Sequence, residues 1–584
     1  MTERVRARYL ETAVVLLLSL VFAVWFGHAT FQHFGVSHDD ETREDDWDLF
    51  TELRWTPYLE VTQYHQFPLW DPYRCSGVPL LGYAESGFLS PWFLLSLIFG
   101  PLAGADLEIL VHLAIALAGG YVLGRVLGLG KLARLGCASV FPASSWFYLH
   151  IAIGHLTFLP YAYLPWILAL YMMSLKRRLL WPAAIAGLLF AVSLGEGGLA
   201  HMFIYSLPLL GLLSILFAAF ELSFWPLISG MTTLFFALAL GAIKLLPVAA
   251  YSSSRPIIDT EYTTLTMFVQ MLFSRNQDLQ RNLVGANWHF WEYGAYLGFP
   301  FAGLALLGLF GSPKRAMPWV IAALAMVAIA AGNFAAGSPW NWMHSVPVFD
   351  SIRVPSRWII PFIAAIAPLV GYGIDNLAHD VRWRRVIAGL LILAGLIDAS
   401  MVVTGNLGHL TANPLPEVTR AKRFRQVWDP SERHMFRFAR AGLGSLDCEN
   451  EVITKHLGVA LGSNQPGYRG EQYLKGAGTV DVHRWSPNVL EYEIDVPDAT
   501  TLIVNQNYDA GWGVSQGRGN VSEDNGLLAV ALPAGHQRLV LSYLGSAFEI
   551  GAAVSLFALI ALIMLVIYEA RRGKPEPLLA RDRE

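Results

Sequence analysis

The amino-acid sequence predicts a mainly α-helical membrane protein, a polytopic bundle of about twelve transmembrane helices with a β-rich domain before the last helix. Three observations predict this class. Of the 584 residues, 54% are hydrophobic and only 15% are charged, whereas soluble domains carry about a quarter charged residues. Apolar runs of roughly 20 residues, the length that crosses a bilayer, recur along the chain. Alternating apolar and polar residues, which are typical of strands, occur in one late segment.

Twelve apolar runs are expected to span the membrane. They lie at 11–31, 107–127, 135–150, 157–174, 181–196, 200–220, 225–246, 293–312, 317–334, 358–377, 386–404 and 547–568. The first run exceeds a signal-peptide core and has no clear small-residue cleavage site, so we interpret it as a retained helix. A further stretch at 89–103 is short and contains Pro91 and Pro101. We expect it to lie in the interface or to re-enter the membrane rather than to cross.

Lysine and arginine residues predict the orientation of these helices. If the twelve runs span and 89–103 does not, all basic clusters fall on one side, which should be the cytoplasm and should also hold both termini. The clusters lie at 4–8, 131–134, 176–178, 314–315, 382–385 and 571–574. The opposite side then receives the external loops 32–88, 250–292 and 335–357 and the long segment 406–546. The sequence thus predicts an active or binding face outside the cytoplasm.

Residues 406–546 are expected to form an extracytoplasmic β-rich domain. It would follow a bundle of residues 1–405 and precede a last helix and cytoplasmic tail at 547–584. Four strand-like runs occur in it, at 489–496, 501–506, 527–532 and 538–543. Turn signals such as "EDNG" and "PAG" separate them. This pattern favours a small sandwich.

The composition disfavours several classes of function. A net charge of −4 without a basic stripe argues against nucleic-acid binding. The sequence has no Gly-rich phosphate loop followed by lysine, no HExxH and no CxxC. We therefore expect no cofactor and no metal; the acidic first loop could hold a divalent cation, but nothing indicates one. Three cysteines are too few for a disulfide framework, and whether Cys75 and Cys448, both external on this topology, form a pair stays open.

The first external loop contains a cluster of carboxylates, at Asp39, Asp40, Glu41, Glu44, Asp45, Asp46 and Asp48. The following apolar side chains recur at nearly helical spacing, which indicates an amphipathic segment lying flat on the membrane with Asp46 and Asp48 at its start. A carboxylate beside apolar surface can have the raised proton affinity that a general base needs. The alternative is a solvated acidic loop without a catalytic role.

Further candidate residues lie near the predicted outer ends of helices, at His155, Glu196, His201, Lys244, Glu292 and Tyr293. Ionisable side chains at membrane depth are costly and tend to mark function, although each alone could be an interfacial anchor. A turn-rich aromatic path at 66–92, which includes Trp70 and Tyr73, either supports the bundle or lines a substrate.

Two arginines, Arg353 and Arg357, precede a predicted helix on the external side. Their position departs from the positive-inside trend, and a guanidinium offers fixed donors that match a phosphate. A lipid phosphate would explain the departure. The alternative is contact with lipid headgroups or an ion pair with Asp350.

Six pieces of the chain resemble, in order and spacing, the YfhO family of bacterial membrane proteins, which is similar to the class C (GT-C) glycosyltransferases. They are "DDWDLF", "QFPLWDPYRCSGVPLL", "GHLTF" with "LPW", "WEYGAYLG", "IRVPSRW" and the late "NYDAGWGV" with "LPAGHQRLVLSYLGSAFEIGAAVS". The resemblance implies a polyprenyl-phosphate-linked sugar as donor and an extracytoplasmic glycan, lipid or protein acceptor, at the bacterial inner membrane.

The resemblance also implies an essential carboxylate in the first external loop, which falls on Asp46 first and Asp48 second. Asp39, Asp40 and Asp45 remain competitors. Glu85, in "GYAESG", stands where relatives favour an amide-bearing segment, so it could alter the preference for donor or acceptor.

The resulting hypothesis is a single, inverting displacement at the anomeric carbon of the sugar. Asp46, steered by His155, would take the proton of the acceptor hydroxyl, and Arg353, Arg357 and Lys244 would bind the donor phosphate. Residues that would line the substrates are His155, His201, Glu292, Tyr293, Tyr64, Trp70, Tyr73 and Glu85. Two alternatives stay open, namely a transporter or flippase of a lipid-linked sugar and a non-catalytic envelope scaffold.

Overall fold

A computed structural model describes residues 3–38, 45–251, 261–277, 288–378, 381–407, 417–429, 435–448 and 458–572, together with 410, 413 and 415. Four of the predicted acidic residues, Asp39, Asp40, Glu41 and Glu44, lie outside the described residues. So do 252–260 and 278–287 of the predicted external loop 250–292.

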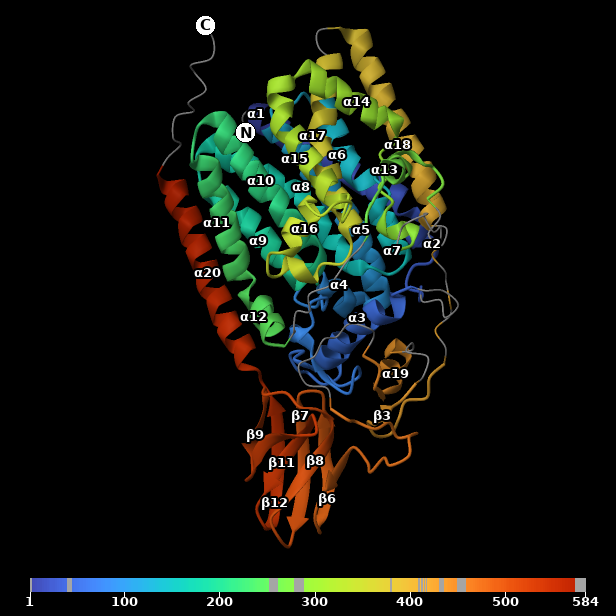
Figure 1. The fold of residues 1–584 in the computed structure, drawn as a ribbon, viewed down its shortest axis with the longest axis vertical. Helices are drawn as coiled ribbons and strands as arrows, with labels where there is room; N and C mark the ends of the chain where they lie inside the picture. Colours follow the sequence, from blue (N-terminus) through green and yellow to red (C-terminus); the bar gives the residue numbers. More distant parts are fainter. Residues whose placement is uncertain are drawn as a thin grey trace.

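The molecule consists of a long helix bundle with a β-rich domain at one end (Figure 1). The bundle helices are α1 (Glu3–Phe26), α2 (His28–Gln32), α3 (Trp47–Thr62), α4 (Phe93–Phe99), α5 (Pro101–Val126), α6 (Lys131–Ala143), α7 (Trp146–Ala152), α8 (Leu164–Arg177), α9 (Trp181–Gly195), α10 (Ile204–Glu221), α11 (Trp225–Leu240), α12 (Ala242–Tyr251), α13 (Leu265–Phe273), α14 (Gly298–Gly311), α15 (Pro313–Ala330), α16 (Pro339–His344), α17 (Ile359–Leu377), α18 (Arg382–Leu407) and α20 (Ser546–Arg571). Helix α19 (Met435–Ala441) lies beside the β domain.

Short 3-10 helices and one π-helix connect or extend these elements. They are η1 (Leu80–Gly82), η2 (Leu156–Tyr163), the π-helix η3 (Leu199–Phe203), η4 (Phe290–Glu292), η5 (Phe349–Ser351) and η6 (Pro355–Trp358). Helices α8, α10 and α17 each continue directly from one of them, so their apolar spans begin at Leu156, Leu199 and Pro355.

Eight helices of the described chain are long and apolar enough to cross a membrane, and nine if the pair α11 and α12, bent by 67°, counts as one span. The protein is therefore membrane-embedded, but the prediction of twelve full spans is wrong. The run 135–150 divides into α6 and α7 at Ser144, and the runs 181–196 and 293–312 yield helices of only 15 and 14 residues. Fourteen residues extend about 21 Å, less than the roughly 30 Å hydrocarbon core.

The stretch 89–103 does not span, as the sequence predicts. It forms the seven-residue α4 and then reverses at Gly100, whose φ of +87° suits glycine. Helix α4 folds back against α5 so closely that a Cβ at Gly104 would lie 2.5 Å from Ser96 Cα. The reversal keeps α4 at the end of the bundle that faces the β domain (Figure 1).

The spans differ in how far they are enclosed. In an apolar 18-residue stretch of the span that ends in α8, 89% of residues are buried, and the corresponding share in the span that ends in α17 is 83%, so both lie at the centre of the bundle. In an apolar 18-residue stretch of α20 only 17% of residues are buried, and α20 contacts α9, α11 and α12. Helix α20 thus lies at the edge, where its other faces suit lipid.

The β domain contains two four-stranded sheets. One has the order β10 (Asn520–Asp524), β11 (Leu527–Leu532), β8 (Thr500–Asn507) and β5 (Gln472–Leu474), and the other has the order β6 (Thr479–Ser486), β7 (Val489–Val496), β12 (Gly535–Tyr543) and β9 (Trp512–Gln516). Buried side chains of both sheets, such as Leu502 and Leu541, belong to one apolar core. The predicted sandwich is confirmed, and β7, β8, β11 and β12 cover all four predicted strand runs.

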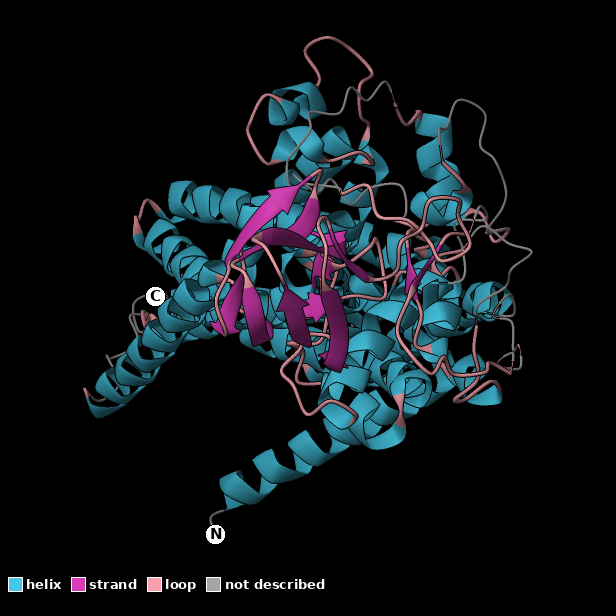
Figure 2. Ribbon diagram, turned by 90° about the horizontal axis from the view of Figure 1, so that it is seen from below, coloured by secondary structure: helices cyan, strands magenta, loops and turns pink. Residues whose placement is uncertain are grey.

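A loop of the bundle end inserts against this sandwich. It contains the short strands β1 (Trp70–Asp71) and β2 (Val78–Pro79), which pair with each other. Asn507 Nδ2 donates to the carbonyl oxygens of Cys75 at 2.5 Å and of Gly77 at 2.9 Å. Cys75 also forms a disulfide with Cys448, which follows the parallel pair β3 (Gln426–Val427) and β4 (Gly444–Ser445). Viewed from below, the strands lie across the end of the bundle (Figure 2).

Candidate active site

Helix α3 places Asp46 beside a turn between α7 and η2. The Asp46 amide donates to Ile153 O at 2.8 Å, and Asp46 Oδ2 accepts from His155 Nε2 at 2.6 Å. The approach depends on Gly154, which has a φ of +90° and whose Cβ would lie 2.6 Å from the Trp47 amide nitrogen. The structure thus brings together the acidic start of α3 and His155, with 39% of the Asp46 side chain exposed.

Aromatic rings continue from His155 into the bundle. His150 Nδ1 and His155 Nδ1 lie 2.9 Å apart in a hydrogen bond. The Phe158 ring stacks on His150 at 3.6 Å on one side and on His201 at 4.4 Å on another, and it lies 5.5 Å from His155. Because one nitrogen of the histidine pair must donate, either His150 donates to a neutral His155 or a protonated His155 donates to both neighbours.

An ion-pair network lies at the far end of this stack. Arg357 donates to Glu292 through two nitrogens, at 2.8 and 2.5 Å, and its Nη1 donates to His201 Nδ1 at 3.2 Å. His201 Nε2 in turn donates to Glu85 Oε1 at 2.9 Å. Because a guanidinium only donates and a carboxylate only accepts, these contacts assign His201 as the neutral tautomer with its proton on Nε2.

The two carboxylates of this network are held ionised. Burial alone would raise the pKa of Glu85, but the hydrogen bond that His201 donates to its carboxylate outweighs burial, and that pKa is lowered to about 2. Burial likewise opposes ionisation of Glu292, and the charge and hydrogen bonds of Arg357 outweigh it, so the Glu292 pKa lies well below its ordinary value. Both groups therefore carry negative charge at neutral pH.

Asp46 and Arg357 consequently lie at two ends of one continuous set of contacts. Asp46 contacts His155, the Phe158 ring lies between His155 and His201, and the Arg357 guanidinium lies 5.2 Å from the centre of the same ring. Six predicted site residues converge here, namely Asp46, Glu85, His155, His201, Glu292 and Arg357. Asp46 and His155 directly precede α3 and η2, Glu85 lies in the loop after η1, and the other three come from η3, η4 and η6.

Arg353 lies near this network but is less enclosed. Its guanidinium lies 5.5 Å from the Trp288 ring centre, and the side chain is half-buried. Burial lowers the Arg353 pKa, and the neighbouring charge of Arg357 lowers it further. The charge of Arg357 thus acts on Arg353, and neighbouring cations favour a nearby anion.

Asp48, the second predicted base, has a different environment. Its two carboxylate oxygens accept the amides of Met435 at 2.8 Å and Phe436 at 3.0 Å, the first residues of α19. The Asp48 side chain is buried. This geometry is that of a carboxylate holding the start of a helix, so we do not carry Asp48 into the proposed chemistry.

The surroundings of Lys244 also do not suit phosphate binding. Its ammonium donates to Tyr83 O at 2.6 Å, to Ser86 O at 3.0 Å and to Ser86 Oγ at 2.5 Å. These three acceptors use all three ammonium hydrogens, and only 1% of the residue is exposed. The prediction that Lys244 binds phosphate is therefore withdrawn, because it holds the 83–86 turn instead.

The predicted aromatic substrate-lining residues lie outside the network. Trp70 is fully buried and donates from Nε1 to Gln506 Oε1 of the β domain at 3.2 Å. Tyr73 is fully buried as well, with its hydroxyl 3.3 Å from that of Tyr64. The Tyr293 hydroxyl donates to Glu261. Trp70, Tyr73 and Tyr293 thus have supporting roles, whereas Tyr64 remains half-buried at a surface.

Glu196, also singled out by the sequence, belongs to a second buried network. It accepts from Tyr163 at 2.6 Å, Ser90 at 3.1 Å and His112 at 3.0 Å. Among the described residues, Glu196, His112 and Glu108 form a group of possible metal ligands within 4.8 Å of one another. Glu108, however, already pairs with Arg54 at 2.9 Å. Hydrogen bonds and this ion pair satisfy the group, so we assign it to the packing of α5 against η2 and α9.

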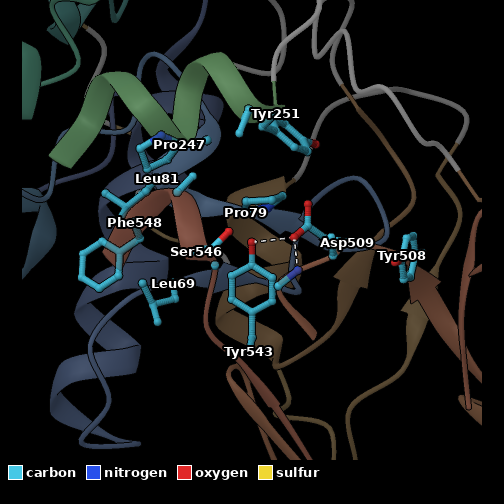
Figure 3. A pocket seen from close by; sticks show the side chains of 16 residues that line it. Leu69, Pro79, Leu81, Pro247, Tyr251, Tyr508, Asp509, Tyr543, Ser546 and Phe548 are labelled. Carbon is cyan, nitrogen blue, oxygen red and sulfur yellow. Dashed lines mark hydrogen bonds between the residues drawn. The ribbon is translucent and has the colours of Figure 1, made fainter. Parts of the chain in front are cut away.

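A cavity of about 220 Å³ lies where the end of α12 meets the β domain. Leu69, Pro79 and Tyr251 line it from the bundle side, and Asp509 and Tyr543 line it from the β domain (Figure 3). The Tyr543 hydroxyl donates to Asp509 Oδ1 at 3.1 Å. None of the six converging residues lines this cavity, so it is separate from the candidate site.

Sequence reasoning missed His150 and Phe158. His150 lies five residues before His155, and the glycine turn at Gly154 folds the two histidines together, which is a signal that the spacing "HIAIGH" contains. The ring of Phe158 has no polar atom and gave no chemical signal. Only the fold shows that it stacks on His150 and His201 and lies 5.2 Å from the Arg357 guanidinium.

The chain was compared with family models, curated proteins and solved structures, and only solved structures match it. No family model and no curated protein matches the chain. Among solved structures, the chain is similar to the arabinofuranosyltransferase AftD from Mycobacteria, with 18% identity, a TM-score of 0.41, and coverage of 68% of this chain and 27% of that one. A mutant of AftD gives 16% identity, a TM-score of 0.37 and coverage of 66% and 27%. The chain thus spans about a quarter of AftD, and no residue role is transferred from it.

Proposed function

We propose that this protein is a membrane glycosyltransferase that moves a sugar from a polyprenyl-phosphate donor to an acceptor hydroxyl, with inversion at the anomeric carbon. The observation that carries the proposal is the shared location of Asp46, paired with His155, and Arg357, reached through Phe158 and His201. A base and a cation are the two groups that such a displacement needs, and here one series of contacts joins them. The resemblance to the YfhO family supports the donor class.

In the proposed reaction, Asp46 acts as general base. Its Oδ2 is held by His155, and the partly exposed carboxylate takes the proton of the acceptor hydroxyl through Oδ1. The acceptor oxygen then forms a bond to the anomeric carbon from the face opposite to the lipid phosphate. The bond from that carbon to the phosphate oxygen breaks, and the phosphate leaves with the electron pair.

The arginines have unequal parts in this reaction. Arg357 is bound on two nitrogens by Glu292, so its main task is to keep a fixed positive charge and to position His201. Arg353 is half-buried and lies over an aromatic face, and we assign it the direct binding of the departing phosphate. Glu85 and His201 would lie toward the sugar.

The proposed orientation follows from the basic clusters, with the site outside the cytoplasm and both termini inside, in the bacterial inner membrane. Helix α1 begins and α20 ends at the bundle end opposite to the β domain (Figure 1). This arrangement agrees with a site and a β domain that share one side.

The test is transfer of labelled sugar from a polyprenyl-phosphate donor by the reconstituted full chain. The Asp46→Asn variant is expected to lose roughly 10²- to 10⁴-fold in rate, the usual contribution of a general base. The matched Asp48→Asn variant should keep its rate per folded molecule, because Asp48 holds α19. Wild-type turnover in Asp46→Asn would remove the proposed base, and movement of the donor across the bilayer without transfer would identify a flippase.

A further inference from the structure

A second cleft of about 1150 Å³ lies between the bundle end and the β domain. Tyr64, just after α3, lines one side. Residues 420–425, which precede β3, line another, and residues 482–485 of β6 line a third. The cleft is distinct from the cavity in Figure 3, with which it shares no lining residue.

The walls of the cleft are strongly basic. Five cationic side chains line it, namely Arg420, Lys422, Arg423, Arg425 and Arg484, and His483 lies beside them. All five are exposed. Within the described parts of the chain, no carboxylate lies within 4.0 Å of any of these charged groups to form an ion pair. Like charges gathered without partners raise the energy of the free protein, and an anionic ligand would offset this cost.

Glu471, which also lines the cleft, does not neutralise it. Its carboxylate accepts from the Tyr468 hydroxyl at 2.6 Å and from the Gln426 amide at 2.8 Å. Burial raises the pKa of Glu471, and these hydrogen bonds with the charge of Arg425 only partly offset the shift. The carboxylate is therefore bound into the wall, and the cations dominate the open space.

The cleft also has an aromatic floor. Phe424 stacks on Trp485 with ring centres 4.3 Å apart and planes 13° apart, and Tyr64 and Tyr73 meet the edges of Trp485 at 6.0 and 6.3 Å. Aromatic faces are electron-rich and attract the partly positive C–H edges of a sugar ring. Cations around an aromatic floor thus fit a ligand that has both sugar faces and negative charges.

We propose that this cleft binds an anionic saccharide chain, one that carries carboxylate or phosphate groups along its length. The proposal rests on the proposed function in one respect, because the chain would be the acceptor. Tyr64 follows α3 and Asp46 precedes it, and a helix of 16 residues separates them by about 24 Å. An acceptor that contacts both the cleft and Asp46 must therefore be a polymer of several sugar units.

The direct test measures binding of labelled oligosaccharides to the detergent-solubilised full chain. Probes are an oligogalacturonate, a phosphorylated oligomannose and, as the neutral counterpart, a maltodextrin of equal length. The anionic probes should bind and weaken with added salt, while the maltodextrin should not bind. The double variant R423Q/R484Q should bind the anionic probes about tenfold more weakly.

The matched control is R437Q/R518Q, which removes two exposed arginines that do not line the cleft. It should bind as wild type does. Equal loss in both variants would overturn the proposal, as would equal binding of maltodextrin. Phosphatidylglycerol vesicles and inorganic phosphate are two further probes. If either binds to the cleft and the saccharides do not, the proposal is overturned, and the cleft is a surface for lipid or for simple anions.

Failure of the proposed function is distinguishable from failure of the cleft. If the anionic saccharides bind through Arg423 and Arg484 but no sugar is ever transferred, the cleft stands and the transferase proposal falls. If transfer occurs and R423Q/R484Q shows an unchanged KM for long anionic acceptors, the cleft proposal falls instead. The expected result is a raised KM for long acceptors with an unchanged kcat.

Discussion

At the scale of single residues, the most unusual feature besides the candidate site is a group of buried carboxylates. Glu52, Glu60 and Asp71 are all fully buried, and the fully buried Arg74 lies beside Glu52 and Asp71. Arg74 Nε lies 3.7 Å from Glu52 and 3.5 Å from Asp71, and the guanidinium lies over the Tyr83 ring. Burial, followed by the charge of Asp71, raises the pKa of Glu60 well above its ordinary value.

The first prediction concerns Glu60→Gln and its pH dependence. Because the pKa of Glu60 is higher in the folded than in the unfolded state, its contribution to stability is complete below the unfolded pKa and is lost as pH rises through the folded pKa. Glutamine does not titrate. The variant should therefore unfold at a higher temperature than wild type near pH 7, and the difference should shrink toward about pH 4.

The measurement is thermal unfolding in detergent, followed by tryptophan fluorescence at several pH values. A difference between variant and wild type that does not change with pH would contradict the pKa argument.

Residue type alone predicted some members of the candidate site and misassigned others. Asp46 and His155 could be paired from the sequence because each carries chemistry that membrane depth makes costly. Lys244 has the same chemistry but is fully satisfied by Tyr83 and Ser86. The sequence does not distinguish Lys244 from Asp46 and His155, because the hydrogen-bond acceptors of Lys244 lie in a turn about 160 residues away.

At the scale of elements, α19 shows how a short helix depends on one partner. It has seven residues, too few to be stable alone. Both oxygens of Asp48 accept the amides at its start. The helix also packs against α3, which carries Asp48.

The second prediction is that Asp48→Ala lowers the free energy of unfolding by about 1–2 kcal/mol, the usual cost of removing a helix cap. Asp48→Asn should cost less, because the amide oxygen can still accept one bond. Hydrogen exchange at the Met435 and Phe436 amides measures the effect locally and should speed up in the order wild type, Asn, Ala. Unchanged exchange in the alanine variant would show that α19 is held by packing alone.

Elements of the β domain were more predictable than those of the bundle. Strand β7 alternates apolar and polar residues, and β8, β11 and β12 are short apolar runs bounded by clear turns, so run length and turn signals located them. Helix α14 begins only at Gly298, because 293–297 pairs with the end of α13 instead. The Ala295 amide donates to Met271 O and the Leu297 amide to Leu272 O. Hydropathy counts apolar residues and does not detect such pairing.

At the scale of the whole molecule, the β domain is attached to the bundle at more than one place. Helix α20 returns the chain to the membrane, and the Cys75–Cys448 disulfide joins the first loop to the segment after β4. Asn507 and Asn488 add hydrogen bonds to the loop that contains Trp70. The candidate site and the basic cleft both depend on this attachment, because α3 connects them.

The third prediction is that reduction of the disulfide destabilises the attached segment. A disulfide across so long a loop contributes roughly 2–5 kcal/mol, so reductant should lower the unfolding temperature and expose 417–448 to protease. The effect should persist in Cys137→Ala, since Cys137 is the buried free cysteine, and should vanish in the double variant C75S/C448S. Identical melting with and without reductant would contradict it.

The general architecture could be predicted from composition, since a charged fraction of 15% leaves little choice but lipid. The number of spans could not, because helix bends and breaks depend on packing. The α11–α12 bend of 67° is one example. The Cys75–Cys448 disulfide could not be predicted either, because its cysteines are 373 residues apart and only packing brings them together.

The contact between Trp70 and Gln506 has a consequence for biosynthesis. These residues are 436 positions apart, so a ribosome that adds about 5–20 residues each second completes the partner on the order of 20–90 s after the first loop emerges. During that interval the nascent loop exposes Trp70, Tyr73 and Arg74, all of which are buried in the finished protein. A holding chaperone on the side where the loop emerges would shield it until the last strands are made.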